Sequence, residues 1–178
     1  MYYGFGQPNN GVMQTSFIVP DLQAAIDSWV TELNVGPWFV LDHFTGGDPV
    51  YRGAPSESAI TLAMSFAGHM NIELIQPLDD KPSVYKEFID ERGYGFHHYG
   101  VSTTRFDKDV AEYEARGYDL AFLATVPTGG RVGYMDTRAN LPGMLEFIEA
   151  SESTDQAFTK FYAASLTWDG SDPVRPFA

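Results

Sequence analysis

Apolar and polar positions divide the chain into two successive runs of predicted elements. In the first run, the pattern predicts strands over residues 12–19, 38–44, 59–66 and 70–76, with a turn at 46–49. Asp21 is a good N-cap for a helix between the first two strands, and Gly36-Pro37 ends that helix. Its apolar residues follow at helical spacing: Leu22, Ile26, Trp29 and Leu33. The predicted order is therefore β-α-β-β-β.

The second run repeats this order. Strands are predicted over residues 96–103, 118–125, 131–136 and 144–149. Asp107 is expected to cap a helix that carries Val110 and Tyr113 and ends at Gly117. A connector between the runs contains a short amphipathic helix with Val84, Tyr85, Phe88 and Ile89. After the second run we expect a helix opening at Thr154 or Asp155, with Phe158, Phe161 and Tyr162 on one face, and a tail from residue 169.

Short stretches at matching positions support an internal duplication. Gln14-Thr15-Ser16-Phe17 opens one run and His98-Tyr99-Gly100-Val101 the other, while Ile72-Glu73-Leu74-Ile75 and Leu145-Glu146-Phe147-Ile148 close them. We therefore predict an α+β fold with a single domain over residues 1–178. Its parts are module one at 12–77, a connector at 78–94, module two at 95–150, and a C-terminal helix and tail at 151–178.

Composition narrows the possible functions. The 178 residues are 44% hydrophobic and 20% charged, as in ordinary globular proteins, and contain no cysteine, so disulfides, thiolate metal sites and a cysteine nucleophile are excluded. The net charge of −13 disfavours nucleic acids and anionic membranes as partners. No signal peptide or long apolar span is visible, so the cytoplasm is the expected location.

Four polar residues occupy equivalent positions of the two runs. Gln14 and His98 open strands, and Glu73 and Glu146 lie within strands between apolar neighbours. Because side chains alternate across a strand, those neighbours should point to the opposite face from each glutamate. A buried carboxylate needs a partner, and two of them with an imidazole and an amide would suit a divalent cation.

The sequence resembles the vicinal oxygen chelate superfamily, and within it glyoxalase I and methylmalonyl-CoA epimerase-like members. The resemblance covers about residues 12–150. It implies two β-α-β-β-β modules that form a cup-shaped mixed sheet around a metal. The stretches that carry it are Val19-Pro20-Asp21-Leu22-Gln23-Ala24-Ala25, Ile72-Glu73-Leu74-Ile75-Gln76-Pro77, Gly95-Phe96-His97-His98-Tyr99-Gly100 and Met144-Leu145-Glu146-Phe147.

The resemblance implies Gln14, Glu73, His98 and Glu146 as the metal ligands. His98 is preferred over His97 because it aligns with Gln14 ahead of an apolar strand. One departure leaves Glu149 as a rival for the last position, since Gly143 precedes Glu146 by three residues where the family usually has four. His43 and His69 are expected to be ordinary surface or turn residues.

A glutamine at the first position favours one kind of chemistry. Iron-dependent ring-cleaving dioxygenases hold their metal with two histidines and one carboxylate, a set that Gln14 spoils. Zinc is the expected ion, with nickel, cobalt or magnesium as alternatives. Such an ion polarises a carbonyl, and Glu146 or Glu73 would move the proton α to it. The expected activity is a glyoxalase-like, metal-dependent lyase, isomerase or epimerase.

Aromatic residues on or near the strands suggest an apolar or aromatic small-molecule substrate. Trp38, Phe39, Phe44 and Tyr51 are the predicted wall of its site. Candidate anchors for an anionic group are Arg52, Arg131 and Arg138, but the sequence carries no convincing glutathione or coenzyme A signature. A homodimer is expected from the resemblance. The competing hypotheses are a ligand-sequestering protein of the bleomycin-resistance kind and an iron-dependent ring-cleaving dioxygenase.

Overall fold

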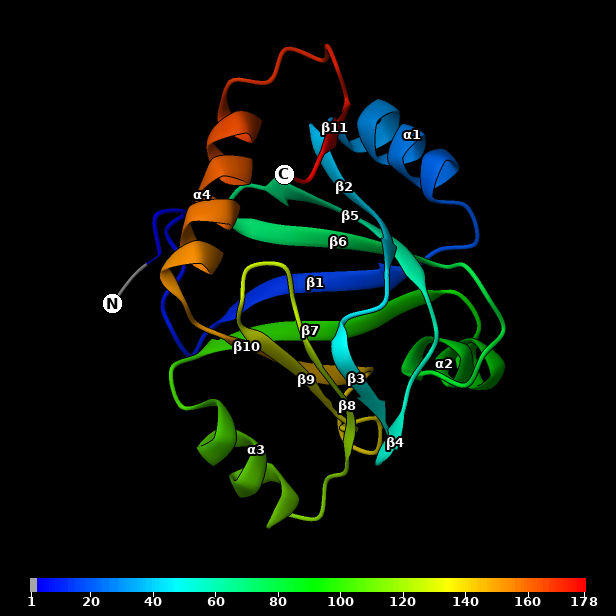
Figure 1. Cartoon of the computed structure of the whole chain (residues 1–178). Helices are drawn as coiled ribbons and strands as arrows, with labels where there is room; N and C mark the ends of the chain where they lie inside the picture. Colours follow the sequence, from blue (N-terminus) through cyan, green and yellow to red (C-terminus); the bar gives the residue numbers. More distant parts are fainter. Residues whose placement is uncertain (1–2) are drawn as a thin grey trace.

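A curled, mixed β-sheet forms the centre of the protein in the computed structural model, which describes residues 3–178 (Figure 1). Across the described residues its strand order is β11-β2-β5-β6-β1-β7-β10-β9-β8-β3-β4. The strands are β1 (Val12–Ile18), β2 (Trp38–Phe44), β3 (Gly47–Tyr51), β4 (Ala54–Pro55), β5 (Ile60–Ala67), β6 (Met70–Pro77), β7 (Gly95–Thr103), β8 (Leu120–Thr125), β9 (Arg131–Met135), β10 (Met144–Glu149) and β11 (Val174–Pro176). The helices are α1 (Leu22–Leu33), α2 (Val84–Arg92), α3 (Phe106–Glu114) and α4 (Glu152–Leu166). None of these helices is long and apolar enough to span a membrane.

The two predicted modules have the same strand order in space. Module one runs β1-β6-β5-β2 outward from the centre of the sheet, and module two runs β7-β10-β9-β8. In each module the first strand pairs in parallel with the last, and β1 pairs antiparallel with β7 where the modules meet. This arrangement confirms the predicted α+β fold and its repeated order. It also places the strands that carry the four candidate ligands next to one another.

Three short strands, β3, β4 and β11, were not predicted. The expected turn at 46–49 is instead the start of β3, which pairs with β8 of module two and with β4. Module one therefore contributes a hairpin to the far edge of module two. The predicted tail contains β11, which pairs in parallel with β2. β3 covers β8 and β11 covers β2, and each of these outer strands of a module would otherwise be an exposed edge.

Three helix boundaries differ from the predictions. Helix α1 ends at Leu33 because Asn34 adopts a left-handed conformation, before Gly36-Pro37 is reached. Helix α3 begins at Phe106, and Asp107 lies in its first turn instead of capping it. Helix α4 begins at Glu152, because the Ser151 hydroxyl accepts the backbone N–H of Thr154 at 3.0 Å and caps the helix earlier than expected.

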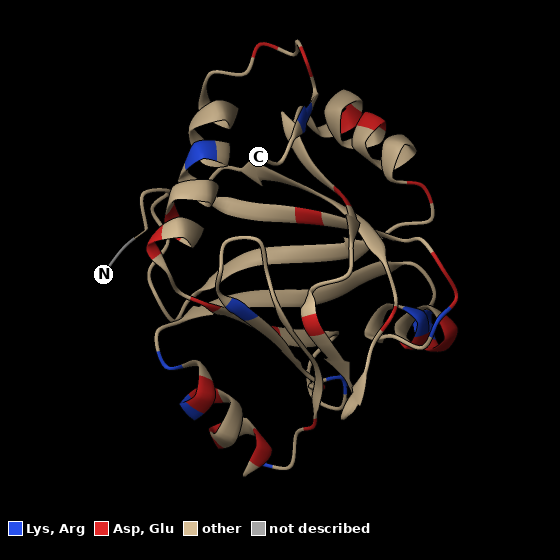
Figure 2. Cartoon of the chain, viewed as in Figure 1, with Lys and Arg blue, Asp and Glu red and all other residues tan. Residues whose placement is uncertain are grey.

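Apolar side chains form three clusters, one on the concave face of the sheet and one under each module's helix. Leu22 and Ile26 of α1 pack behind module one with Ile72 and Leu74 of β6. Under α3, Phe106 and Val110 pack in the same way with Leu145 and Phe147 of β10. The neighbours of Glu73 and Glu146 thus point away from the concave face, as strand alternation requires. Most charged residues lie on helices and loops, and the strands carry few (Figure 2).

The C-terminal segment closes one side of the concave face. Helix α4 packs against β5, and its Phe161 stacks on Phe39 of β2 with ring centroids 4.1 Å apart. Phe158 of α4 is buried in the same cluster, and Phe177, after β11, meets Phe161 edge to face. The segment outside the repeated modules is therefore part of the core that surrounds the concave face.

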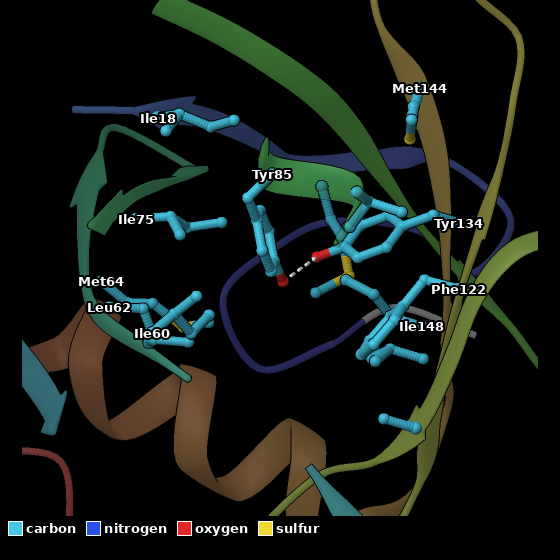
Figure 3. Close-up of a cluster of buried hydrophobic side chains, with 14 of the residues drawn as sticks. Ile18, Ile60, Leu62, Met64, Ile75, Tyr85, Phe122, Tyr134, Met144 and Ile148 are labelled. Carbon is cyan, nitrogen blue, oxygen red and sulfur yellow. Dashed lines mark hydrogen bonds between the residues drawn. The ribbon is translucent and has the colours of Figure 1, made fainter. Parts of the chain in front are cut away.

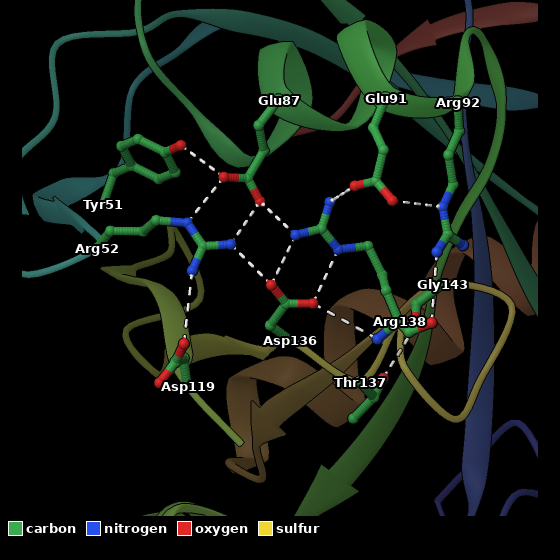
Figure 4. A network of polar contacts seen from close by, with 10 residues as sticks. All are labelled: Tyr51, Arg52, Glu87, Glu91, Arg92, Asp119, Asp136, Thr137, Arg138 and Gly143. Carbon is green, nitrogen blue, oxygen red and sulfur yellow. Dashed lines mark hydrogen bonds and ion pairs between the residues drawn. The ribbon is translucent and has the colours of Figure 1, made fainter. Parts of the chain in front are cut away.

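A network of charged residues ties the β3–β4 hairpin to α2 and module two (Figure 4). Arg52, at the tip of the hairpin, donates to Glu87 of α2 and to Asp136 after β9. Arg138 donates to the same two carboxylates and pairs with Glu91. Bonds to these arginines lower the pKa values of Glu87 and Asp136 against the opposing effect of burial. The network fixes the position of α2, which contributes to the site below.

Candidate functional site

A single cavity on the concave face contains three of the four candidate ligands. Its volume is about 70 Å³, which is small but exceeds the space that a single water molecule needs. Its walls are mainly apolar side chains from β2, β5, β8, β9, β10, α4 and the C-terminus. Near the centre of the sheet this apolar lining is interrupted by carboxylate, amide and phenol groups. They belong to Gln14, Glu73, Tyr85, Tyr134 and Glu146.

The four candidate ligands come together on four adjacent strands, β6, β1, β7 and β10. Nε2 of His98 lies 3.5 Å from Oε2 of Glu73 and 3.2 Å from Oε2 of Glu146. Gln14 lines the same cavity and pairs in register with Gly100 of β7. A Cβ at Gly100 would lie 2.8 Å from Cβ of Gln14, so glycine is needed for the close approach. All four side chains are buried, with Glu146 the most exposed at 5%.

Each of the four has a buried polar atom without a hydrogen-bond partner among the described residues. These atoms are Oε1 of Gln14, Oε2 of Glu73, Nε2 of His98 and Oε2 of Glu146. Leaving such atoms unsatisfied costs about 1–3 kcal/mol each, more when they are charged. An imidazole nitrogen and three oxygens are suitable donors for a divalent cation. A site that binds a cation would leave these four atoms without partners inside the protein, as is seen here.

The spacing around His98 is also compatible with a metal. Two donors bound at about 2.1 Å lie roughly 3.0 Å apart in octahedral and 3.4 Å apart in tetrahedral geometry. The two His98–Glu distances, 3.2 and 3.5 Å, are close to these values. As placed, however, no three His, Asp or Glu side chains in residues 3–178 are arranged to hold a metal ion. The residue types fit a cation, with Gln14 as the neutral fourth donor, but binding would require at least one of these side chains to move.

Burial controls the protonation of the site. The pKa of Glu73 is raised to about 7, mainly by burial, which His98 opposes and the nearby Glu146 reinforces. Burial also raises the pKa of Tyr85 and of Tyr134, so both phenols keep their protons at neutral pH. Metal-free Glu73 is thus half protonated near neutrality, in the range suited to accepting and returning a proton.

His97 sets the tautomer of His98. Their Nδ1 atoms lie 2.8 Å apart, so one ring donates and the other accepts. Burial lowers the pKa of His97 well below its ordinary value, which keeps this ring neutral. When His98 donates from Nδ1, its Nε2 carries a lone pair beside the two glutamates, which is the form that binds a metal.

Replacing His97 by phenylalanine should therefore weaken divalent-metal binding by about 10–100-fold, because His98 loses its acceptor while the aromatic pocket stays filled. His97→Gln keeps an acceptor and should recover part of the loss. Calorimetric titration with zinc measures the effect, and His43→Ala, at an exposed position, is the control. Equal affinities in His97→Phe and wild type would show that the His97–His98 bond does not orient the ligand.

The four aromatic residues predicted to form the wall lie in different environments. Phe44 lines the cavity. Trp38 faces the cluster under α1, where its Nε1 donates to the carbonyl of Val35 at 2.9 Å. Phe39 lies beneath α4, and the Tyr51 hydroxyl donates to Glu87 at 2.6 Å. Only Phe44 therefore belongs to the cavity wall. Trp38 points to the opposite face of the sheet, α4 covers Phe39, and Tyr51 belongs to the displaced hairpin.

Several wall residues were not identified from the sequence as part of a site. Leu62, Met64, Tyr85, Phe122 and Tyr134 surround the cavity (Figure 3). On β5 the signal was available, because Ile60, Leu62 and Met64 are alternate residues of one strand. Tyr85 was assigned only to a helix face, and the sequence does not show that this face closes a cavity.

The predicted anion anchors and the rival ligand lie outside the cavity. Arg52 and Arg138 are held in the network of Figure 4. Arg131 pairs with Asp107 and with Glu149, whose side chain is 32% exposed. Glu149 therefore has a partner of its own, and the structure brings Glu146, not Glu149, to His98.

Comparisons with known proteins agree with this architecture. No protein of curated function matches the chain. A hypothetical protein from Bacillus halodurans has a TM-score of 0.60 and 20% identity, with 82% of this chain and 97% of that chain covered. Methylmalonyl-CoA epimerase from Mycobacterium tuberculosis has a TM-score of 0.58 and 19% identity, covering 82% and 91%. A Streptomyces coelicolor methylmalonyl-CoA epimerase in complex with 2-nitronate-propionyl-CoA has a TM-score of 0.56 and 14% identity, covering 82% and 97%.

These structural similarities show a shared fold, whereas a sequence match identifies the family. Residues 13–136 match the model of the family described as the Glyoxalase/Bleomycin resistance protein/Dioxygenase superfamily. The match includes three of the four candidate ligands and extends over well over half of the chain. The protein therefore belongs to this superfamily, the vicinal oxygen chelate superfamily.

Proposed function

We propose that the protein is a divalent-metal-dependent lyase, isomerase or epimerase that removes a proton α to the carbonyl of a small, apolar or aromatic substrate. The observation that carries this proposal is the group of unpartnered donor atoms on Gln14, Glu73, His98 and Glu146 at the floor of an apolar cavity. Members of the superfamily typically bind divalent metals. Zinc is the first candidate, and nickel, cobalt and magnesium are alternatives.

The residues of the cavity have separate tasks in this proposal. A bound divalent ion would act as a Lewis acid that polarises the substrate carbonyl. Gln14, Glu73, His98 and Glu146 would hold the ion, and one of the two glutamates would accept the α-proton. Leu62, Met64 and Phe122 exclude water and hold the apolar part of the substrate. Such exclusion strengthens the electrostatic effect of every charged group in the site.

A coenzyme A thioester is a poorer candidate substrate, although several of the structural neighbours are named as methylmalonyl-CoA epimerases. Its phosphates require cationic groups or N–H donors near the mouth. Among the described residues that line the cavity, none is a lysine or an arginine. The three arginines considered from the sequence are engaged with carboxylates elsewhere. We therefore favour a substrate that ends within the cavity.

The apolar walls also support a second candidate, ligand binding without turnover. The two functions are separated by loading metal-free protein with zinc, nickel, cobalt or magnesium and incubating it with small aryl and alkyl carbonyl compounds in D₂O. Loss of the α-proton NMR signal reports proton removal. Glu73→Gln and Glu146→Gln should each slow exchange by about 10²–10⁴-fold, whereas Glu149→Gln should not.

Tight binding of the same compounds without exchange, unchanged by a chelator, would establish the sequestering function. Bound iron with oxygen-dependent turnover would establish the dioxygenase instead. A homodimer in the cytoplasm is part of our proposal, and light scattering of the purified protein tests the oligomeric state.

A further inference from the structure

Two tyrosine hydroxyls meet inside the cavity, close to the candidate ligands. Tyr85 comes from α2, in the connector between the modules, and Tyr134 comes from β9 (Figure 3). Their hydroxyl oxygens lie 3.5 Å apart, and both residues line the cavity. The exposed fraction is 5% for Tyr85 and 3% for Tyr134. The Tyr134 ring also lies against His98, with centroids 4.8 Å apart, so the pair is adjacent to the ligand set.

One O–H group of the hydroxyl pair is left without an acceptor. Each phenol carries one O–H group, and the single contact between them uses one proton at the outer limit of hydrogen-bond length. The other O–H has no acceptor among the described residues. A buried donor without an acceptor is costly, and here it faces the open space of the cavity. The missing partner is therefore an oxygen atom of whatever occupies the cavity.

We propose that Tyr85 and Tyr134 form the binding site for a carbonyl oxygen of an aryl or branched-alkyl carbonyl compound. The inference rests on the proposed function only in calling this compound a substrate. The apolar part of the ligand lies between Leu62, Met64 and Phe122, while the free phenol proton of the tyrosine pair points to its oxygen. During proton removal, negative charge develops on the carbonyl oxygen, and this hydrogen bond becomes stronger.

Both tyrosines lie on elements that other contacts of the fold hold in place. Tyr85 lies outside both modules. Glu87 lies two residues further along α2, and its salt bridges hold that helix in place. The ring centroids of Tyr134 and Phe122 lie 5.6 Å apart, and the two rings are inclined by 31°. Both hydroxyls are thus carried on rigid supports that do not depend on a bound metal.

Two probes of nearly equal shape test the inference on metal-free protein. Acetophenone has a carbonyl oxygen where α-methylstyrene has a methylene group. In Tyr85→Phe and Tyr134→Phe, the affinity for acetophenone should fall by about 3–10-fold, while that for α-methylstyrene should stay the same. NMR titration gives both dissociation constants, and Tyr94→Phe, which removes an exposed hydroxyl outside the cavity, is the matched control.

Undetectable acetophenone binding, or equal changes for both probes, would overturn the inference. Thermal melting checks that each variant is folded, and phenylalanine preserves the ring packing in both. Because the titrations use metal-free protein, their result is separate from that of the proton-exchange assay. Discrimination between the probes without any proton exchange would support the oxygen site and contradict the proposed enzymatic function.

Discussion

Purified wild-type protein should contain about one equivalent of a divalent metal, and His98→Ala should contain almost none. Zinc sites with four protein ligands bind with about 10–16 kcal/mol, so an equal share for one ligand is about 3 kcal/mol, or a loss of more than about hundredfold in affinity. Nε2 of His98 lies near both glutamates, so its loss removes the donor that the two carboxylates share. Elemental analysis after dialysis against a weak chelator makes the measurement.

His43→Ala is the control for this experiment, because His43 is exposed and distant in sequence from the candidate ligands. Metal retained in His98→Ala would place the ligand set elsewhere. A protein that takes up no zinc, nickel, cobalt or magnesium would leave ligand binding as the function of the cavity. Iron in the wild-type protein would favour oxygen chemistry in spite of Gln14.

The metal affinity should also depend on pH in a defined direction. Burial raises the pKa of metal-free Glu73 to about 7, so below that pH the incoming ion must displace a proton. The apparent affinity should therefore rise by about tenfold per pH unit up to neutrality and then level off. Titrations between pH 5.5 and 8 in two buffers of different ionisation enthalpy would count the released proton. In Glu73→Gln the dependence should be much flatter.

The main strands and the grouping of the four candidate ligands were predictable because strand alternation is a local rule. Glu73 and Glu146 each interrupt an apolar strand, and their neighbours pack under α1 and α3 as the two-residue period requires. The duplication then related Gln14 to His98 across the centre of the sheet. Neither step needed knowledge of distant contacts, and the structure brings the side chains together as those rules imply.

The cavity wall was less predictable because it depends on which helices and strands cover each face of the sheet. Trp38 and Phe39 are adjacent and both fully buried, one under α1 and the other under α4, so no polar residue marks which faces the cavity. The partner of β3 lies in the other module, which local residue patterns do not specify. Tyr85 is part of an ordinary apolar helix face, and only the position of α2 brings its hydroxyl to Tyr134.

Removing one aromatic ring of α4 should strongly destabilise the protein. Phe161 is 1% exposed and stacks on Phe39 at 4.1 Å. Phe161→Ala should lower the free energy of unfolding by about 3–5 kcal/mol, since a large ring is lost from a packed site that the sheet prevents from collapsing. Urea unfolding followed by circular dichroism measures the loss. Leu166→Ala, on the same helix at 65% exposure, should change stability by less than about 0.5 kcal/mol.

This comparison also decides what the C-terminal segment does. Phe158 and Phe177 line the cavity beside Phe161, so an undocked α4 would widen the cavity and admit water. Phe161→Ala should therefore weaken binding of apolar probes even at temperatures where the protein remains folded. If it lost less than about 1 kcal/mol while Leu166→Ala lost more, the buried face of α4 would not be the one that stabilises the protein. The exposed face would then be the one with a partner, and a second copy of the chain would be the first candidate to test.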